Sequence, residues 1–353
     1  MCCASKRKRL VPGTICAWRS TPSRPLDQSL PVADPVPDAA RAAHAARELR
    51  WLLLSPPLLD TASGAHPAVV QRFSDAERQA IAAWLDELDR HPESLLRFVH
   101  PSRPSEAAAD VRWRAPSPRL GRRAERLMEF FLREGPTHRL VAANVALRSA
   151  PQGERNTRTT IGEIDFLLQD AQDRRWQWEL AVKFYLCTAS GMHAAPADFI
   201  GPDRIDSLAT KLHKMFDRQL RHTPPEPWDA QAWTPAACTR GRLFYRWGDA
   251  VPVTPGVAAD HLRGGWVERE RLGEIPDADQ PIWQSVARSD WMAPPLAHGA
   301  LPAQTLAEIG RAIDELAGAS GHPSPTATLV VRLDADSACS TPGREPLFIV
   351  SPV

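Results

Sequence analysis

Gly162-Glu163-Ile164-Asp165-Phe166-Leu167-Leu168 is followed, after a short polar turn, by Trp178-Glu179-Leu180-Ala181-Val182-Lys183. Both runs are apolar enough for buried β-strands, and the polar turn between them predicts a hairpin. One acid, Asp165, interrupts the first run, while an acid and a lysine, Glu179 and Lys183, interrupt the second. Charges placed in this way on neighbouring strands can hold a divalent metal beside an ammonium group, which suits phosphodiester hydrolysis.

Side-chain alternation along the strands decides which of these charges can meet. In a strand over 175–186, Glu179 and Lys183 share one face, about 13 Å apart if the strand is regular, while Trp178 and Leu180 face the core on the other side. In a strand over 160–169, Asp165 shares a face with Glu163. If the two faces coincide, the carboxylates converge near one lysine, and such a cluster needs a bound cation or a retained proton. The pattern therefore predicts a site for Mg²⁺ or Mn²⁺.

The flanking sequence predicts a mixed α/β layer structure around this hairpin. A helix over 119–134 and a strand over 138–148 precede it, while a helix over 204–221, capped by Asp203, and a strand over 241–247 follow it. The other expected elements are helices over 37–54, from Ser74 (in a capping box) to Arg90, after Pro92 and over 302–318, and strands over 264–269, 326–333 and 346–350.

Composition shifts predict four parts of the chain. These are a disordered, basic, Pro-rich tail over 1–36, a helical N-terminal region over 37–115, the α/β core over 116–300, and a C-terminal helix with strands over 301–353 packed on that core.

Composition limits the class of protein. The 353 residues are 43% hydrophobic and carry a formal net charge of +1, so no overall basic character indicates nucleic acid. Six cysteines occur without CxxC pairs, which favours a reduced, cytoplasmic setting without structural zinc. No apolar run has transmembrane length, so no membrane role is expected. The many Ala, Arg, Pro and Trp residues are typical of a bacterial chain.

Lysine is scarce, because arginine supplies nearly all of the positive charge. The five lysines are Lys6, Lys8, Lys183, Lys211 and Lys214. A lysine inside an apolar strand therefore hints that a compact ammonium group is required there.

The order strand-Asp, turn, strand-Glu-Lys resembles the signature of PD-(D/E)XK phosphodiesterases. That resemblance implies a restriction-endonuclease-like fold, whose core is a helix, a three-stranded meander, a helix and a further strand. A narrower set of motifs resembles the bacterial family called domain of unknown function 1853, over roughly residues 45–295. The matching motifs are Gly162–Leu168, Glu179–Leu186, Gly201-Pro202, Gly241–Tyr245, His261–Gly264 and Trp291–Pro294.

The resemblance also implies roles for individual residues. Asp165 matches the first metal ligand, Glu179 the second acid and Lys183 the catalytic lysine. Glu125 matches an acid that many members carry on the helix before the strands. Glu163 is read as a neighbouring group of the ligands.

The helix after the strands carries further candidates. Lys211 and Gln219 are candidates for contact with a nucleic-acid backbone, although a solvated helix face is the default interpretation.

The spacing departs from the superfamily pattern, because three residues rather than one separate Glu179 from Lys183, and Ala181 stands where the acid is usual. A β-bulge could bring Glu179 and Lys183 together, or Glu179 could reach the metal from one pleat further away. If neither holds, the site is incomplete and the protein binds without cutting.

Two functions therefore remain open at this level. The first is a metal-dependent, nuclease-like phosphodiesterase acting on nucleic acid. The alternative is a catalytically degenerate binding or scaffold module with the same fold. The structural readings of the same residues are that Asp165 caps a turn or pairs with an arginine, and that Glu179 and Lys183 form an ion pair on a solvated sheet face. A third class, an interaction protein that uses its helical N-terminal region, also fits the pattern.

Overall fold

The computed structural model describes residues 38–60, 68–99, 120–149, 159–294, 302–320, 327–333 and 345–351. The expected tail over 1–36 and the connection over 101–118, with its expected boundary near 115, lie outside these residues.

One mixed β-sheet forms the centre of the fold, with its main strands in the order β2-β3-β4-β6-β7-β10-β9-β8. Pairing is antiparallel along β2, β3 and β4, parallel from β4 through β6 and β7 to β10, and antiparallel again for β9 and β8. The short β1 pairs with β6 and the short β5 with β4. The bounds are β1 Val69–Val70, β2 His138–Arg148, β3 Thr160–Asp170, β4 Arg175–Cys187, β5 Phe199–Ile200, β6 Thr234–Arg246, β7 Leu262–Glu268, β8 Trp283–Val286, β9 Ala327–Arg332 and β10 Leu347–Val350.

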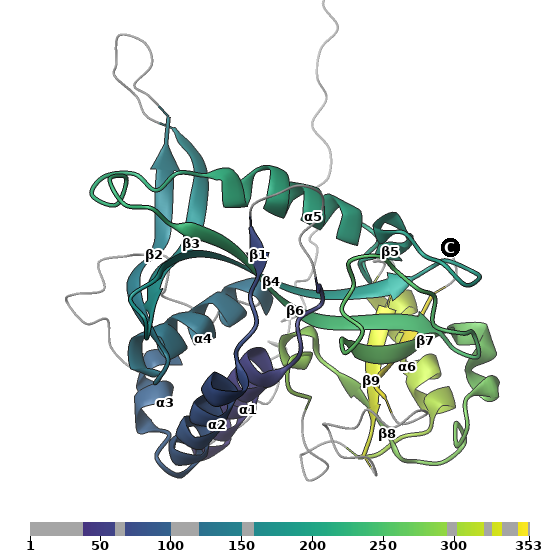
Figure 1. Cartoon of the computed structure of the whole chain (residues 1–353). Helices are drawn as coiled ribbons and strands as arrows, with labels where there is room; N and C mark the ends of the chain where they lie inside the picture. The colour runs from purple at the N-terminus through teal and green to yellow at the C-terminus, as the bar shows by residue number, and fades with distance from the viewer. Residues whose placement is uncertain are drawn as a thin grey trace, which may run out of the picture. The chain divides into compact units, whose positions relative to one another are not determined.

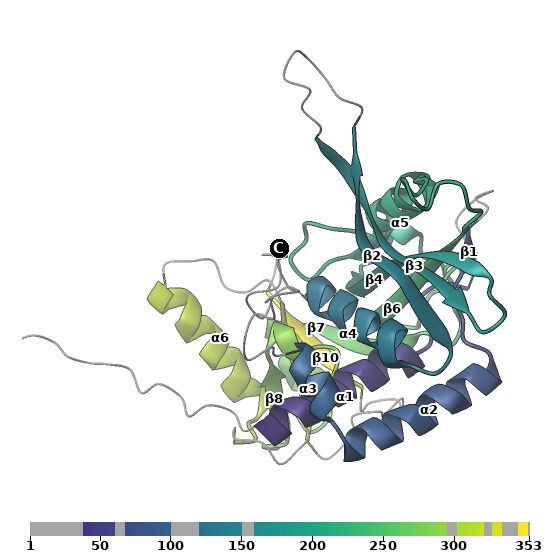
Figure 2. The same cartoon turned by 90° about the vertical axis from the view of Figure 1, so that its left-hand side faces the viewer.

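Helices cover both faces of the sheet, which confirms the expected mixed α/β architecture (Figures 1 and 2). On one face lie α1 (Asp38–Leu54), α2 (Asp75–Arg90), α3 (Glu93–Val99) and α4 (Leu120–Glu134). On the opposite face lies α5 (Leu208–Asp217), and α6 (Leu306–Ser320) packs on the β7–β10–β9 part. None of the helices in the described part of the chain is both long enough and apolar enough to cross a membrane.

The side chains of β4 are divided between two buried clusters, as the alternation predicts. Trp178, Leu180 and Val182 pack with the α1–α4 layer, whereas Ala181 and Tyr185 pack with α5. Because β4 is buried on both faces, its charged side chains must find partners inside the protein.

The chain between β5 and α5 differs from the expected helix over 204–221. The helix begins only at Leu208, with Ser207 as its N-cap, and a separate 3-10 turn, η3 (Gln219–Arg221), follows it. Arg204 has φ 60°, a left-handed conformation that a helix cannot contain. The carboxylate of Asp203 accepts a hydrogen bond from the Ile205 amide at 3.3 Å, which stabilises a turn instead of a helix start. The expected cap at Asp203 is therefore wrong.

Strands β3 and β4 separate in the middle of the hairpin. Their pairing extends from Gln169–Arg175 only to Phe166–Trp178, although both strands continue beyond this point. Past Trp178, β4 follows β6 without any shift of register as far as Leu186. The β-bulge that could have brought Glu179 toward Lys183 is therefore absent from β4. The separation leaves a fork between β3 and β4, with one edge of β4 open.

Candidate functional site

Two carboxylates face each other where β3 and β4 separate. Since Phe166 pairs with Trp178, the next opposing residues are Asp165 and Glu179. Asp165 Oδ2 accepts a hydrogen bond from the backbone amide of Leu180 at 2.9 Å, which replaces the ladder bond that a continued hairpin would make. Glu179 is only 4% exposed. The fork thus holds two acids close together in a largely buried position.

An ammonium group and an amide reach Glu179 from α5 and from the 3-10 turn η3 that follows it. Gln219, in η3, donates a hydrogen bond from Nε2 to Glu179 Oε1. Lys211 Nζ, from α5, lies 3.5 Å from the same oxygen and 3.2 Å from Gln219 Oε1. The three side chains form a closed polar set, which partly compensates the buried charge of Glu179.

Glu125 approaches the fork from α4, while Glu163 lies next to Asp165 along β3. Both are partly buried. Arg122 Nη1 lies 3.4 Å from Glu125 Oε2 and 3.9 Å from Glu163 Oε1. The α4 helix therefore adds one acid to the site and one arginine at its margin.

Burial raises the pKa values of all three acids, and the charges of neighbouring acids add to each rise. Burial and the charge of Asp165 raise the pKa of Glu125 to about 7. Burial raises the pKa of Asp165 to about 6, although the Leu180 amide and Lys211 act in the opposite direction. Burial and Asp165 likewise raise the pKa of Glu179 well above its usual range. At neutral pH this cluster retains protons, and a divalent cation would compete for the same oxygens.

The structure does not bring Lys183 to these carboxylates. Its ammonium pairs with Asp206, which also accepts a hydrogen bond from the Tyr185 hydroxyl at 3.0 Å. Because β4 is regular, Lys183 stays two pleats from Glu179. The amine beside the acids is that of Lys211.

A cavity of about 590 Å³ runs from Glu125 along the open edge of β4, and neither Asp165 nor Glu179 is among its lining residues. Glu125 and Lys211 lie on its wall, as do Lys183 and Asp206. The amide of Leu180 points toward β3, so alternation directs the backbone groups of Val182 and Phe184 the same way, into the cavity. An extended chain with hydrogen-bonding groups can therefore reach Glu125 and Lys211 from this side.

The acids provide hard oxygen donors of the kind that Mg²⁺ and Mn²⁺ prefer. In the part of the chain that the structure describes, however, no group of three or more His, Cys, Asp or Glu side chains is arranged to hold a metal ion. Asp165 instead accepts a hydrogen bond from the Leu180 amide, and Glu179 accepts one from Gln219. The donor chemistry thus fits a divalent ion, but binding requires these side chains to lose protons and reorient.

Sequence reasoning gave Lys211 only a role in substrate contact and did not single out Asp206. The scarcity of lysine that drew attention to Lys183 applies equally to Lys211. The spacing of residues along one strand cannot reveal an amine that arrives from a helix more than 30 residues later.

A family model matches residues 47–350, and the family is described as "Domain of unknown function (DUF1853)". This confirms the family expected from the motifs. No curated protein and no solved structure matches the chain.

Proposed function

Because the chain belongs to the domain of unknown function 1853 family, whose description names no activity, we propose an activity from the site itself. The proposal is metal-dependent hydrolysis of phosphodiester bonds in nucleic acid at the fork of β3 and β4. The observation that carries it is the opposition of Asp165 and Glu179 beside the Lys211 ammonium, 3.5 Å from Glu179.

The same proposal includes kinship with the PD-(D/E)XK superfamily and its restriction-endonuclease-like fold. The order α4, β2, β3, β4, α5, β6 supports it, since it repeats the helix, meander, helix and strand of that fold. The bacterial, cytoplasmic setting suggested by composition belongs to the proposal as well.

Asp165 and Glu179 would hold Mg²⁺ or Mn²⁺, with Glu125 assisting from α4. The bound ion would lower the pKa of a coordinated water and neutralise charge on the phosphate. Other residues of the site hold the two acids in position. The Leu180 amide fixes one oxygen of Asp165, and Gln219 holds Glu179 in place.

Lys211 rather than Lys183 is the amine that we assign to the reacting phosphate. Its ammonium lies beside Glu179 and also lines the cavity, so it can reach both the acids and an entering substrate. Lys183, held by Asp206 farther along the same wall, is suited to contact the substrate away from the reacting bond.

The test compares cleavage of labelled DNA and RNA, with Mg²⁺ or Mn²⁺, by the parent chain and its variants. Asp165→Asn should abolish metal-dependent cleavage, and Lys211→Met should reduce it by about a hundredfold or more. Lys183→Met should weaken substrate binding more than turnover. The matched control is Lys214→Met, an exposed lysine on the same helix, which should leave cleavage unchanged. Full cleavage by Asp165→Asn refutes the proposal.

A second candidate is a binding module with a degenerate site. It is favoured because Asp165 and Glu179 already accept hydrogen bonds from Leu180 and Gln219, and because no set of three ligands is preformed among the described residues. Calorimetric titration with Mn²⁺ distinguishes the two. A heat of binding that disappears in Asp165→Asn supports the enzyme, whereas the absence of such heat supports the binding module.

A further inference from the structure

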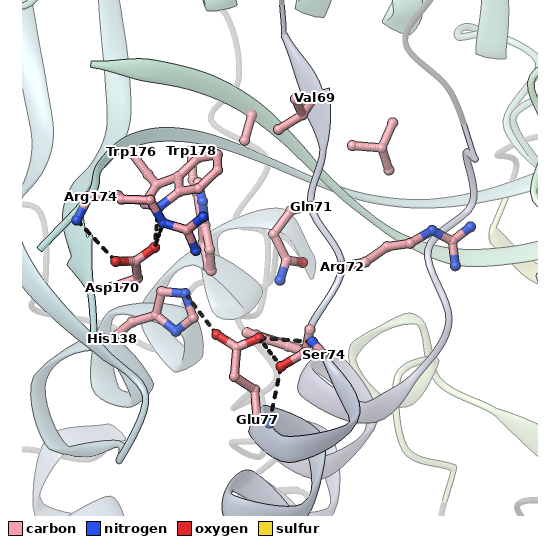
Figure 3. A pocket seen from close by; sticks show the side chains of 13 residues that line it. Val69, Gln71, Arg72, Ser74, Glu77, His138, Asp170, Arg174, Trp176 and Trp178 are labelled. Atoms are coloured by element: carbon pink, nitrogen blue, oxygen red, sulfur yellow. Dashed lines mark hydrogen bonds and ion pairs between the residues drawn. The ribbon is translucent and has the colours of Figure 1, made fainter. Parts of the chain in front are cut away.

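A second cavity, of about 360 Å³, lies on the α1–α4 face near the turn of the β3–β4 hairpin (Figure 3). Its walls come from β1 and the chain after it, the start of α2, and the ends of β2, β3 and β4. It shares no lining residue with the cavity at the fork. Its volume falls near the lower end of the roughly 300–1,000 Å³ typical of small-molecule sites.

Aromatic rings form one wall of this cavity. Trp176 and Trp178 project from the same face of β4, and both line the cavity. Trp178 is packed against Phe73 and His138, with ring centroids 6.1 Å and 5.0 Å away. These contacts bury Trp178 to 2% exposure, so Trp178 backs the wall, and the partly buried Trp176 ring is the surface on which a flat heterocycle can stack.

Gln71 offers a hydrogen-bond donor from inside the protein. The residue is 6% exposed. Its Oε1 accepts from Arg240 Nη2 at 2.8 Å and from Cys238 Sγ at 3.6 Å. These two donors fix the orientation of the amide, so Nε2 turns toward the cavity, where the described residues provide it with no partner (Figure 3). A buried amide held in this way requires an acceptor from a ligand or from water.

Glu77 offers an acceptor across from this donor. Its Oε2 receives hydrogen bonds from the amide and hydroxyl of Ser74 in the capping box, both at 2.8 Å. Its Oε1 has a longer contact, 3.8 Å from His138 Nε2. The capping box fixes the carboxylate, so Oε1 can accept from a ligand without a change in the helix terminus.

Arg174 places a guanidinium at the mouth of the cavity. It lies over the Trp176 ring, 5.5 Å from the centroid, and donates from Nε to Asp170 Oδ2 at 2.7 Å. Its Nη2 lies 3.4 Å from Gln172 Oε1, and among the residues that the structure describes none binds Nη1, which can therefore bind an anion. Asp170 also accepts from Trp176 Nε1 at 2.9 Å, so the arginine and the stacking ring are held as one unit.

From this combination we propose that the cavity binds a nucleoside monophosphate. The base stacks on Trp176, which is backed by the buried Trp178, accepts from Gln71 Nε2 and donates to Glu77, while the phosphate lies against Arg174. Every common nucleobase carries an acceptor and a donor on neighbouring edge atoms, so the site takes nucleotides as a class. The inference is independent of the proposed cleavage, because the two cavities have no residue in common.

The proposal is tested by isothermal titration of the full chain with AMP, GMP, CMP and UMP. A chelator removes divalent metal, so that the proposed cleavage site at the fork is inactive. Saturable binding of at least one nucleotide at one site per chain is expected. Arg174→Gln should weaken nucleotide binding about tenfold, the worth of one charge-assisted hydrogen bond. The same substitution should leave adenosine binding unchanged, because adenosine has no phosphate.

The matched control is Arg175→Gln, the exposed neighbour that does not line the cavity, and it should bind as the parent does. Gln71→Glu keeps an oxygen for Arg240 but removes the donor, so it should weaken adenosine and nucleotides alike. Circular dichroism verifies the fold of each variant. The proposal is overturned if no nucleotide binds or if inorganic phosphate binds as tightly as the nucleotides. It is also overturned if Arg175→Gln weakens nucleotide binding as much as Arg174→Gln does.

Discussion

Single side chains at the fork show how the chain tolerates acids inside a sheet that is buried on both faces. Asp165 uses a backbone amide, and Glu179 uses Gln219 and Lys211, where water would otherwise solvate them. These contacts offset only part of the cost, because the pKa values of Asp165 and Glu125 remain raised, to about 6 and about 7. Acids with raised pKa values are typical of sites that bind a cation or move a proton.

The raised pKa of Glu125 makes stability depend on pH. A carboxyl whose folded-state pKa lies above its unfolded value stabilises the protein below the unfolded pKa, and that contribution is lost as pH rises through the folded pKa. Without divalent metal, the free energy of unfolding should therefore fall from pH about 4.5 to about 7, the ordinary and folded pKa values of Glu125. Urea unfolding across this range, with chelator present, measures the effect.

Glu125→Gln should reduce this fall by about 1 kcal/mol or more, since one pKa unit corresponds to about 1.4 kcal/mol. The control Glu134→Gln alters an exposed acid at the end of the same helix and should leave the pH profile as it is. Identical slopes in the parent and in Glu125→Gln would show that Glu125 is not perturbed by its surroundings.

At the scale of elements, the site depends on the close approach of β4 and β6. These strands run parallel in unbroken register from Trp176–Thr234 to Leu186–Phe244. Gly241 lies opposite Lys183 with φ 146°, and a Cβ built there would lie 1.7 Å from the Lys183 carbonyl oxygen. Only glycine therefore allows β6 to pair this closely with β4, along the edge opposite the cavity.

Gly241→Ala should lower the free energy of unfolding by about 3 kcal/mol or more, because the strands must separate to admit the methyl group. Urea or thermal unfolding measures the loss. Gly248→Ala is the matched control, since Gly248 also has positive φ, 85°, but its Cβ would meet no atom within 4 Å. That variant should lose only about 1 kcal/mol. Equal losses in both would contradict a steric role for Gly241.

At the scale of the whole molecule, the C-terminal strands belong to the same sheet as the site. β10 lies between β7 and β9, and its Phe348 is fully buried in the cluster that also contains α1, α4 and β4. The ring of Phe348 packs 4.4 Å from that of Phe244 and 5.0 Å from that of Trp291, measured between centroids. Trp291 in turn lines the cavity at the fork. The C-terminal part therefore supports one wall of that cavity.

Phe348→Ala should lower the free energy of unfolding by about 3–5 kcal/mol, the usual cost of removing a buried aromatic ring. Chemical unfolding measures this cost. Val253→Ala, at a position that is 64% exposed, should change stability by no more than about 0.5 kcal/mol. A small loss in Phe348→Ala would mean that β10 contributes little to the core.

The sequence predicted most helices and strands to within a few residues, because apolar periodicity, capping boxes and turns are local signals. The strand over 138–148 and the Ser74 capping box agree with β2 and with the start of α2. The helix expected after Asp203 fails at its start, because the turn over 201–206 depends on local hydrogen bonds that periodicity does not report.

The sequence by itself determined the order of elements, the family, and the presence of acids on two neighbouring strands. Local spacing is sufficient for these, since side chains alternate with a period of two along any strand. Only the tertiary structure decided that β3 and β4 separate at Asp165, that Lys183 pairs with Asp206, and that Lys211 takes the place beside Glu179. The physical reason is that such contacts join residues distant in sequence, and their geometry follows from strand register and helix packing across the whole sheet.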